Sequence, residues 1–181
     1  MNTAARQLAW TLLGAPALRL SYHNLYAFRR WLLHRFGATL GDRCRIRSTA
    51  TIDRPWLVTI GERAIVGDHA HLRGSSSIHI GDRTTISQMV VLCTDELTHD
   101  GTSTTTPIHV GHDCWVAADT HVRPGAHIAD GTLVGARSLV EGELPPWTIA
   151  AGEPALPRRP RHLAGRSPEH PPAPVHPAAT P

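Results

Sequence analysis

A strict six-residue repeat runs from Val110 to Val140. Every sixth residue there is apolar and β-branched: Val110, Val116, Val122, Ile128, Val134 and Val140. A helix needs an apolar residue about every 3.6 positions and a strand every 2, so neither explains this period. A small side chain follows four residues after each of the first five: Cys114, Thr120, Ala126, Thr132 and Ser138. The pattern is typical of a β-helix whose short strands turn a corner every six residues.

The same repeat extends back to residue 40 in groups of three. The earlier triplets are Leu40, Ile46 and Ile52, then Ile60, Val66 and Leu72, then Ile80, Ile86 and Leu92. Three hexads make one triangular coil, so residues 38–144 predict about five stacked coils. The repeat is interrupted by two extra residues after each of the first two triplets, and by twelve between Leu92 and Val110. Repeat proteins place insertions in loops on one face, where function is often found. We therefore expect chemistry in the long insertion, 93–109.

Composition narrows the class of protein. A chain of 181 residues suits one domain with end segments. Its net charge is +3, and all of its 18 basic residues are scattered arginines, which argues against a nucleic-acid interface. Three widely spaced cysteines predict neither a disulfide framework nor a zinc site, and we expect a cytoplasmic protein.

The two ends differ from the repeat. Residues 1–37 predict a helical cap on the first coil, with an amphipathic helix at 24–36 that presents Leu25, Phe28, Trp31, Leu32 and Phe36 on one face and stops at Gly37. A second interpretation, compatible with the first, is a helix resting on the inner face of a membrane. Residues 145–159 predict a closing segment, and the Pro-rich residues 160–181 a disordered tail.

The insertion reads CTDELTHDGTSTTTPIH and contains His99 beside Asp100. A loop histidine suits general-base catalysis because its ordinary pKa lies near neutral pH. Asp95, Glu96 or Asp100 could orient its ring. The residues alone favour a solvent-exposed loop histidine over a general base, and they leave a Ser or Thr nucleophile within 102–106 as a further alternative.

A second set of histidines follows from the register. His79, His109 and His127 each precede the first inward residue of a coil, so they should form an outward ladder with steps of about 4.8 Å. His71 and His121 hold the equivalent place on another face. The ladder is either a solvated polar stripe or a group that binds metal or titrates together.

Several segments are more specific than the repeat. They are RRWLLHRFGATLG at 29–41, IDRPWLVTIG at 52–61, ISQMVVLCT at 86–94, THD at 98–100, PIHVGHDCWVAA at 107–118, VRPGAHIADGTLVGARSLV at 122–140 and PPWTIAAGEPA at 145–155. Together they resemble the left-handed β-helix hexapeptide acyltransferases, specifically the colanic acid biosynthesis acetyltransferase group.

The resemblance implies a homotrimer with active sites between subunits, acetyl-CoA as donor, no metal, and a sugar or glycolipid acceptor. It implies that His99 is the catalytic base, with Asp100 beside it. It also implies that Trp115 flanks the pantetheine arm, that Ala118 and Ala136 let it lie against the coil, and that Arg159 approaches the CoA phosphates. The family's Thr-Lys pair after the last coil is Glu141-Gly142 here.

Two other functions stay open from the sequence. The γ-type carbonic anhydrases share this fold, but their two metal histidines five residues apart have no counterpart in the coils. A trimeric scaffold without activity is the other alternative, favoured if the loop after His99, which is shorter than in the family, and the lost basic residues abolish CoA binding.

Overall fold

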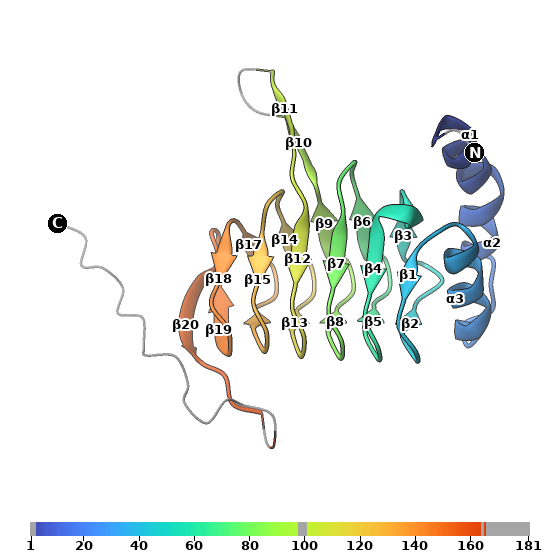
Figure 1. Ribbon diagram of the computed structural model, residues 1–181. Helices are drawn as coiled ribbons and strands as arrows, with labels where there is room; N and C mark the ends of the chain where they lie inside the picture. The colour runs from blue at the N-terminus through green and yellow to red at the C-terminus, as the bar shows by residue number, and fades with distance from the viewer. Residues whose placement is uncertain (1–2, 98–100, 164, 166–181) are drawn as a thin grey trace.

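The computed structural model describes residues 3–97, 101–163 and 165. Short strands stack into three parallel sheets that form the faces of a triangular prism, a left-handed parallel β-helix of about five turns (Figure 1). The fold expected from the six-residue repeat is therefore confirmed. We call the three faces A, B and C, in the order in which the chain visits them.

Face A contains β1 (Thr39–Leu40), β4 (Val58–Ile60), β7 (Ile78–Ile80), β12 (Ile108–Val110), β15 (His127–Ile128) and β18 (Glu143–Leu144). Face B contains β2 (Arg45–Ile46), β5 (Ile65–Val66), β8 (Thr85–Ile86), β13 (Trp115–Val116), β16 (Leu133–Val134) and β19 (Thr148–Ala151). Face C contains β3 (Thr51–Ile52), β6 (His71–Arg73), β9 (Val91–Cys93), β14 (His121–Val122) and β17 (Leu139–Val140). The last element, β20 (Leu156–Pro160), folds back antiparallel onto β19.

The repeat positions form the core. Inward residues such as Val66, Ile86, Val116 and Val134 are fully buried, each stacked on its counterpart one coil away. Pairing in register lets every strand bury the same side chain, so one column of aliphatic residues lines the inside of each face.

The corners explain the small residues. Each corner from face A to face B, the A–B corner, has a residue with positive φ three positions after the inward residue: Arg43, Arg63, Arg83, Asp113, Gly131 and Trp147. The next residue is small or polar and buried, as Cys44, Ala64 and Thr84 show. The left-handed conformation costs roughly 1–2 kcal/mol per non-glycine residue, and neighbouring turns of the same shape hold it in place.

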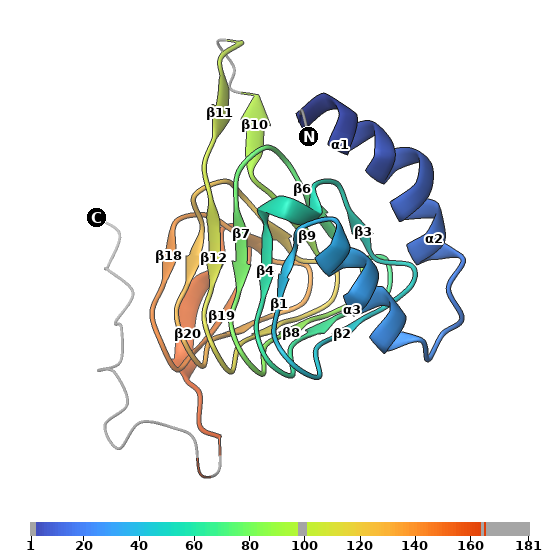
Figure 2. The ribbon, with the colours of Figure 1, turned by 45° about the vertical axis from the view of Figure 1, so that its right-hand side comes forward.

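All three insertions lie at the C–A corner, where face C leads to face A. The first holds the short 3₁₀ helix η2 (Pro55–Leu57), the second lies between β6 and β7, and the third extends outward as a ribbon of β10 (Asp95–Leu97) and β11 (Ser103–Thr105). The expectation that the insertions gather on one side is confirmed (Figures 1 and 2).

Helices lie against the first coil (Figure 2). They are α1 (Thr3–Ala9), the π-helical turn η1 (Trp10–Gly14), α2 (Ala15–Arg19) and α3 (Tyr26–Arg35). Gly37, with φ of 94°, follows the end of α3 as predicted. Within the described residues, no helix is long and apolar enough to cross a membrane.

The face of α3 that packs on the coil differs from the expected one. Leu32 and Leu33 are buried and Phe36 is partly buried, but Leu25, Phe28 and Trp31 are exposed. The reason is Arg29, which is also buried on this face. Its guanidinium donates hydrogen bonds to the Ser21 hydroxyl and to the carbonyls of the chain between α2 and α3, which turns the outer side of the helix to solvent.

Candidate active site

The β10–β11 ribbon flanks the segment of the sequence that contains His99. Its strands pair antiparallel, with Asp95 opposite Thr105 and Leu97 opposite Ser103. His99 and Asp100 lie outside the described residues, between the ends of these two strands. The ribbon leaves the prism at the C–A corner, about halfway along the coil axis (Figure 1).

The base of the ribbon is fixed by Asp95. Its carboxylate accepts hydrogen bonds from the Ser75 backbone N–H and the Ser75 hydroxyl, both at 2.9 Å. Burial raises the pKa of Asp95, but hydrogen bonds from Ser75, Thr105 and Thr94 outweigh it and hold the pKa below its usual value. The ribbon is therefore attached to the insertion one coil earlier.

Glu96 is fixed in turn by the next coil. Arg123 forms ion pairs with both Glu96 and Glu141. Glu96 and Arg123, with His121 and Leu139 of face C, line a small cavity of about 280 Å³ at the ribbon base. Asp95 and Glu96 thus have structural partners of their own, and Asp100 is the one proposed orienting carboxylate without a described position.

The four residues expected to contact CoA lie together on or beside face B. Trp115 pairs with Leu133, Leu133 with Ile149, and Ile149 with Arg159, so the row from Trp115 to Arg159 spans three strand steps, about 14 Å. Trp115 is 46% exposed, and its indole N–H donates to Ser87 Oγ at 2.9 Å.

Ala118 and Ala136 follow at the B–C corner, where face B leads to face C. They stack on one another, since the N–H of Arg137 donates to the carbonyl of Ala118 at 2.9 Å. Their short side chains leave the backbone of this corner open to a ligand lying along the coils. These two alanines therefore lie at the corner that adjoins the row from Trp115 to Arg159.

Two arginines near Arg159 have other partners. Arg161 donates to the carbonyls of Asp113 and Gly131, both at 2.9 Å, and Arg158 donates to Ala151. Burial lowers the pKa of Arg161. These side chains hold the closing segment on the coil, while Arg159 is exposed.

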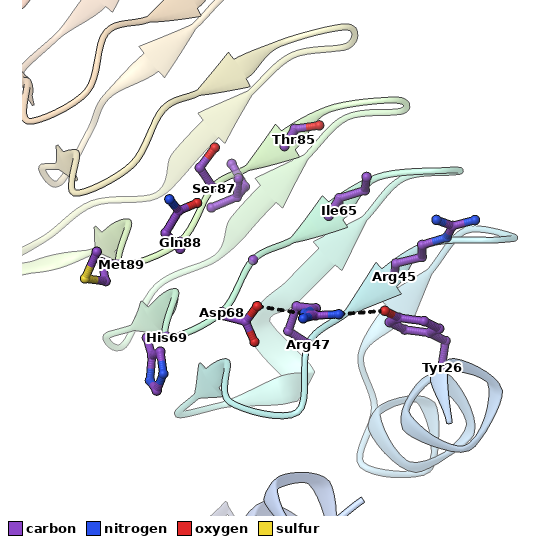
Figure 3. Close-up of a pocket in the computed structure, with 12 residues that line it drawn as sticks. Tyr26, Arg45, Arg47, Ile65, Asp68, His69, Thr85, Ser87, Gln88 and Met89 are labelled. Atoms are coloured by element: carbon purple, nitrogen blue, oxygen red, sulfur yellow. Dashed lines mark hydrogen bonds and ion pairs between the residues drawn. The ribbon is translucent and has the colours of Figure 1, made fainter. Parts of the chain in front are cut away.

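A larger cavity, of about 540 Å³, opens on face B over the first coils (Figure 3). Arg47 lines this cavity, and its guanidinium donates hydrogen bonds to Asp68 Oδ2 at 2.8 Å and to the Tyr26 hydroxyl at 3.0 Å. The Asp68 pKa is lowered, first by the hydrogen bond from Thr49 and then by Arg47. Ser87, the partner of Trp115, also lines this cavity, so it adjoins the Trp115 row.

Sequence reasoning missed this polar cluster. The available signal was the register, which places Arg47, Gly67 and Ser87 one residue after the inward position of three successive coils. The contribution of Tyr26 had no such signal, because it comes from α3.

The histidine ladder is present on face A. The ring centroids of His79 and His109 lie 4.6 Å apart, and those of His109 and His127 lie 5.1 Å apart. His71 and His121 share a row on face C, separated by Val91. Stacked rings lie face to face, so their nitrogens do not converge on one point. In the part of the chain that the structure describes, no three His, Cys, Asp or Glu side chains are arranged to hold a metal ion.

The ribbon and the Trp115 row lie on opposite sides of one chain. The ribbon leaves from the C–A corner, and face B is the face opposite that corner (Figure 2). One copy of the chain therefore does not bring the two together.

Comparison with known proteins identifies relatives over most of the chain, although no family model matches it. Over 158 residues the chain is 41% identical to the colanic acid biosynthesis acetyltransferase WcaF of Escherichia coli K12, covering 86% of this chain and 87% of WcaF.

Solved structures show the same fold. A galactoside acetyltransferase in complex with coenzyme A matches with a TM-score of 0.81 and 21% identity, over 88% of this chain and 82% of that one. A hexapeptide-repeat acetyltransferase of Vibrio cholerae, complexed with acetyl-CoA, matches with a TM-score of 0.79 and 19% identity, over 88% and 89%. On its repeat, its fold and its identity to WcaF, the chain belongs to the hexapeptide-repeat acetyltransferase family of colanic acid biosynthesis.

Proposed function

We propose that this protein transfers an acetyl group from acetyl-CoA to a hydroxyl of a sugar or exopolysaccharide precursor, with His99 as general base. The similarity to WcaF and the CoA complexes of its structural relatives support the reaction class. The observation that carries the proposal is that Trp115 and Arg159 share a row on face B, with Ala118 and Ala136 stacked at the adjoining corner; together they would give a long, flexible donor one path.

Each donor contact has a physical basis. The exposed indole of Trp115 offers an apolar face to the pantetheine arm. The stacked alanines let the arm approach the backbone, and the guanidinium of Arg159 pairs with phosphate.

The catalytic step needs two copies of the chain. A three-fold axis parallel to the coil axis keeps every element at its own height. The ribbon follows β9, in the same coil as β8, and returns to β12, in the same coil as β13. In a homotrimer it would thus reach a neighbour's face B at the height of Thr85 and Trp115. Half-buried apolar side chains that point outward, Ile65, Val91 and Leu139, would gain cover in such an assembly.

The chemistry proceeds by direct transfer within a ternary complex. The imidazole of His99 removes the proton from the acceptor hydroxyl as its oxygen attacks the thioester carbonyl. The tetrahedral intermediate then collapses, the C–S bond breaks, and the imidazolium returns the proton to the departing CoA sulfur. Asp100 orients the ring and stabilises its charged form. No covalent enzyme intermediate is required.

The 540 Å³ cavity is the place we propose for the acceptor. It adjoins Trp115 on the side away from Arg159, so an acceptor there would lie beyond the thioester end of the donor. Its Arg47, Asp68 and Gln88 supply the fixed donors and acceptors that sugar hydroxyls need (Figure 3).

Calorimetry with acetyl-CoA tests the donor site first. We expect binding by the wild type and binding weakened about tenfold in Arg159→Ala, the loss of one charge-assisted contact. Arg63→Ala, which removes an exposed arginine from the A–B corner, is the matched control and should bind like the wild type. No detectable binding by the folded wild type would refute the donor site and leave an inactive scaffold.

Release of CoA thiol in the presence of a panel of sugars and sugar nucleotides tests the base. We expect His99→Ala to lose roughly 10²- to 10⁴-fold in rate while still binding acetyl-CoA and keeping the mass of a trimer of the 19.7 kDa chain. An unchanged rate would rule out His99 as the base.

A further inference from the structure

Exposed apolar side chains concentrate at one end of the molecule. Of the twelve large hydrophobic residues that are exposed in the described chain, eight lie in the helical cap: Leu8, Leu12, Leu13, Leu20, Tyr22, Leu25, Phe28 and Trp31. The coil, the ribbon and the closing strand, which make up most of the described chain, contribute only the other four. Such a concentration marks an interaction surface rather than ordinary surface composition.

These side chains stand on helices that are firmly attached to the coil. In η1 and α2, Trp10, Gly14 and Leu18 are buried. The indole N–H of Trp10 donates a hydrogen bond to the Ile52 carbonyl at 2.7 Å. Leu12 lies on the outer side, 63% exposed. On α3, the rings of Phe28 and Trp31 stack with their centroids 6.0 Å apart, and both side chains are exposed.

The charge of the same segment is of one sign. The first acidic residue of the chain is Asp42, and before it stand five arginines: Arg6, Arg19, Arg29, Arg30 and Arg35. Arg29 is buried, whereas Arg19 and Arg35 are exposed beside the apolar residues. The segment thus combines exposed Leu, Trp and Tyr side chains with arginines and has no carboxylate. Helices that lie in a lipid interface have this composition.

We propose that the cap of α1, η1, α2 and α3 docks the protein onto the surface of an anionic lipid bilayer, with the first-coil end of the prism facing the lipid. The exposed leucines and Trp31 enter the interface, and Arg19 and Arg35 contact the lipid headgroups. The ribbon and face B lie along the sides of the prism, so this contact leaves them accessible (Figure 2).

A second copy of the chain fits this surface less well. Two caps meeting head to head would bring together two arginine-rich surfaces without an acidic partner, which is unfavourable. A cap docking on a different face of the next copy would be a heterologous contact, which builds an open filament unless the rotation between copies closes into a ring. An anionic bilayer complements both the charge and the apolar residues.

Co-sedimentation of the full chain with vesicles tests the proposal, and it requires neither acetyl-CoA nor catalysis. We expect binding to vesicles of phosphatidylcholine with phosphatidylglycerol, weaker binding to phosphatidylcholine alone, and weakening by added salt. The double variant Leu12→Glu/Trp31→Glu should bind at least about tenfold more weakly, because two apolar side chains no longer enter the interface. Arg19→Gln/Arg35→Gln should reduce the preference for anionic vesicles.

The matched control is Leu156→Glu, which replaces a 52% exposed leucine at the far end of the prism and should sediment like the wild type. Leu12 and Trp31 are more exposed than Leu156, so their replacement should leave the circular dichroism spectrum intact. Failure of the wild type to bind anionic vesicles, or equal binding by wild type and double variant, overturns the proposal. A lower oligomeric mass of the double variant, measured by light scattering, would identify the cap as an interface between copies instead.

Discussion

The A–B corners and the C–A corners of the same prism follow opposite rules. At the A–B corner every turn has the same length, a residue in the left-handed conformation and a buried small or polar residue after it. At the C–A corner the length changes from coil to coil, and one insertion extends into the β10–β11 ribbon. Stacking demands that most corners repeat, because each supports the next. A corner that only has to return the chain to face A can vary, and the proposed catalytic residue is found there.

The largest difference in the free energy of unfolding should appear between two variants, one with a residue inserted at an A–B corner and one with a residue inserted at the C–A corner. A glycine inserted after Asp113 changes the register of β13, so Val116 would no longer point inward. We expect this variant to lose most of its free energy of unfolding, which is roughly 5–15 kcal/mol for a domain. A glycine inserted after Thr102, in the ribbon connection, is the control and should change it by less than about 1 kcal/mol. Urea unfolding measures both, and similar losses would disprove the contrast between corners.

A smaller effect is expected from the ion pairs that hold the ribbon. Arg123→Gln breaks the contacts with Glu96 and Glu141, whose side chains are partly exposed, so the free energy of unfolding should fall by at most about 1 kcal/mol. Hydrogen exchange of residues 95–97 and 103–105 should nevertheless become faster.

Arg83→Gln is the control for that experiment. It breaks the pair of Arg83 with Asp113 at the A–B corner, where stacked neighbours hold the backbone. Exchange in the ribbon should remain unchanged in this variant. Faster ribbon exchange in both variants would mean that Arg123 does not anchor the ribbon specifically.

The smallest effect concerns the histidine ladder on face A. Burial lowers the pKa of His109, and the neighbouring His79 and His127 lower it further, while Asp130 acts in the opposite direction and His112 in the same. The folded protein binds a proton at His109 less readily than the unfolded chain does. The contribution of His109 to the free energy of unfolding is therefore complete above a pH of about 6.5, the ordinary pKa of histidine, and it declines as the pH falls toward the lowered pKa.

His109→Gln should therefore make the decline in stability between about pH 7.5 and 5.5 shallower, by removing one group that titrates across it. Urea midpoints at several pH values measure the slope. His71→Gln, on face C, removes a histidine that is hydrogen-bonded to Asp53 and tests whether any histidine gives the same result. A slope in His109→Gln equal to that of the wild type would contradict the prediction.

Several outward residues could be placed from the sequence, because the six-residue repeat assigns each residue number to a particular face and coil of the prism. His79, His109 and His127 were expected to stack, and they do. Trp115 and Arg159, which the resemblance assigns to the donor, share a row of face B. The roles of these residues, and those of His99 and Asp100, stay predictions.

The six-residue repeat could not predict the contacts between the coils and the segments outside the repeat. The outward side of α3 was assigned wrongly, because the burial of Arg29 depends on hydrogen bonds to a connecting segment without periodicity. The Arg47–Asp68–Tyr26 cluster was missed for the same reason, since Tyr26 reaches it from α3.

The sequence by itself determined the prism, its five turns and the corner that carries the insertions, because a six-residue period has few other solutions and each coil repeats the last. The tertiary structure alone decided which side chains of the cap face solvent and which carboxylates at the ribbon base already have hydrogen-bond or ion-pair partners. It also decided that the ribbon and the donor surface lie on opposite sides of one chain. Those facts depend on distances between segments that no local pattern encodes.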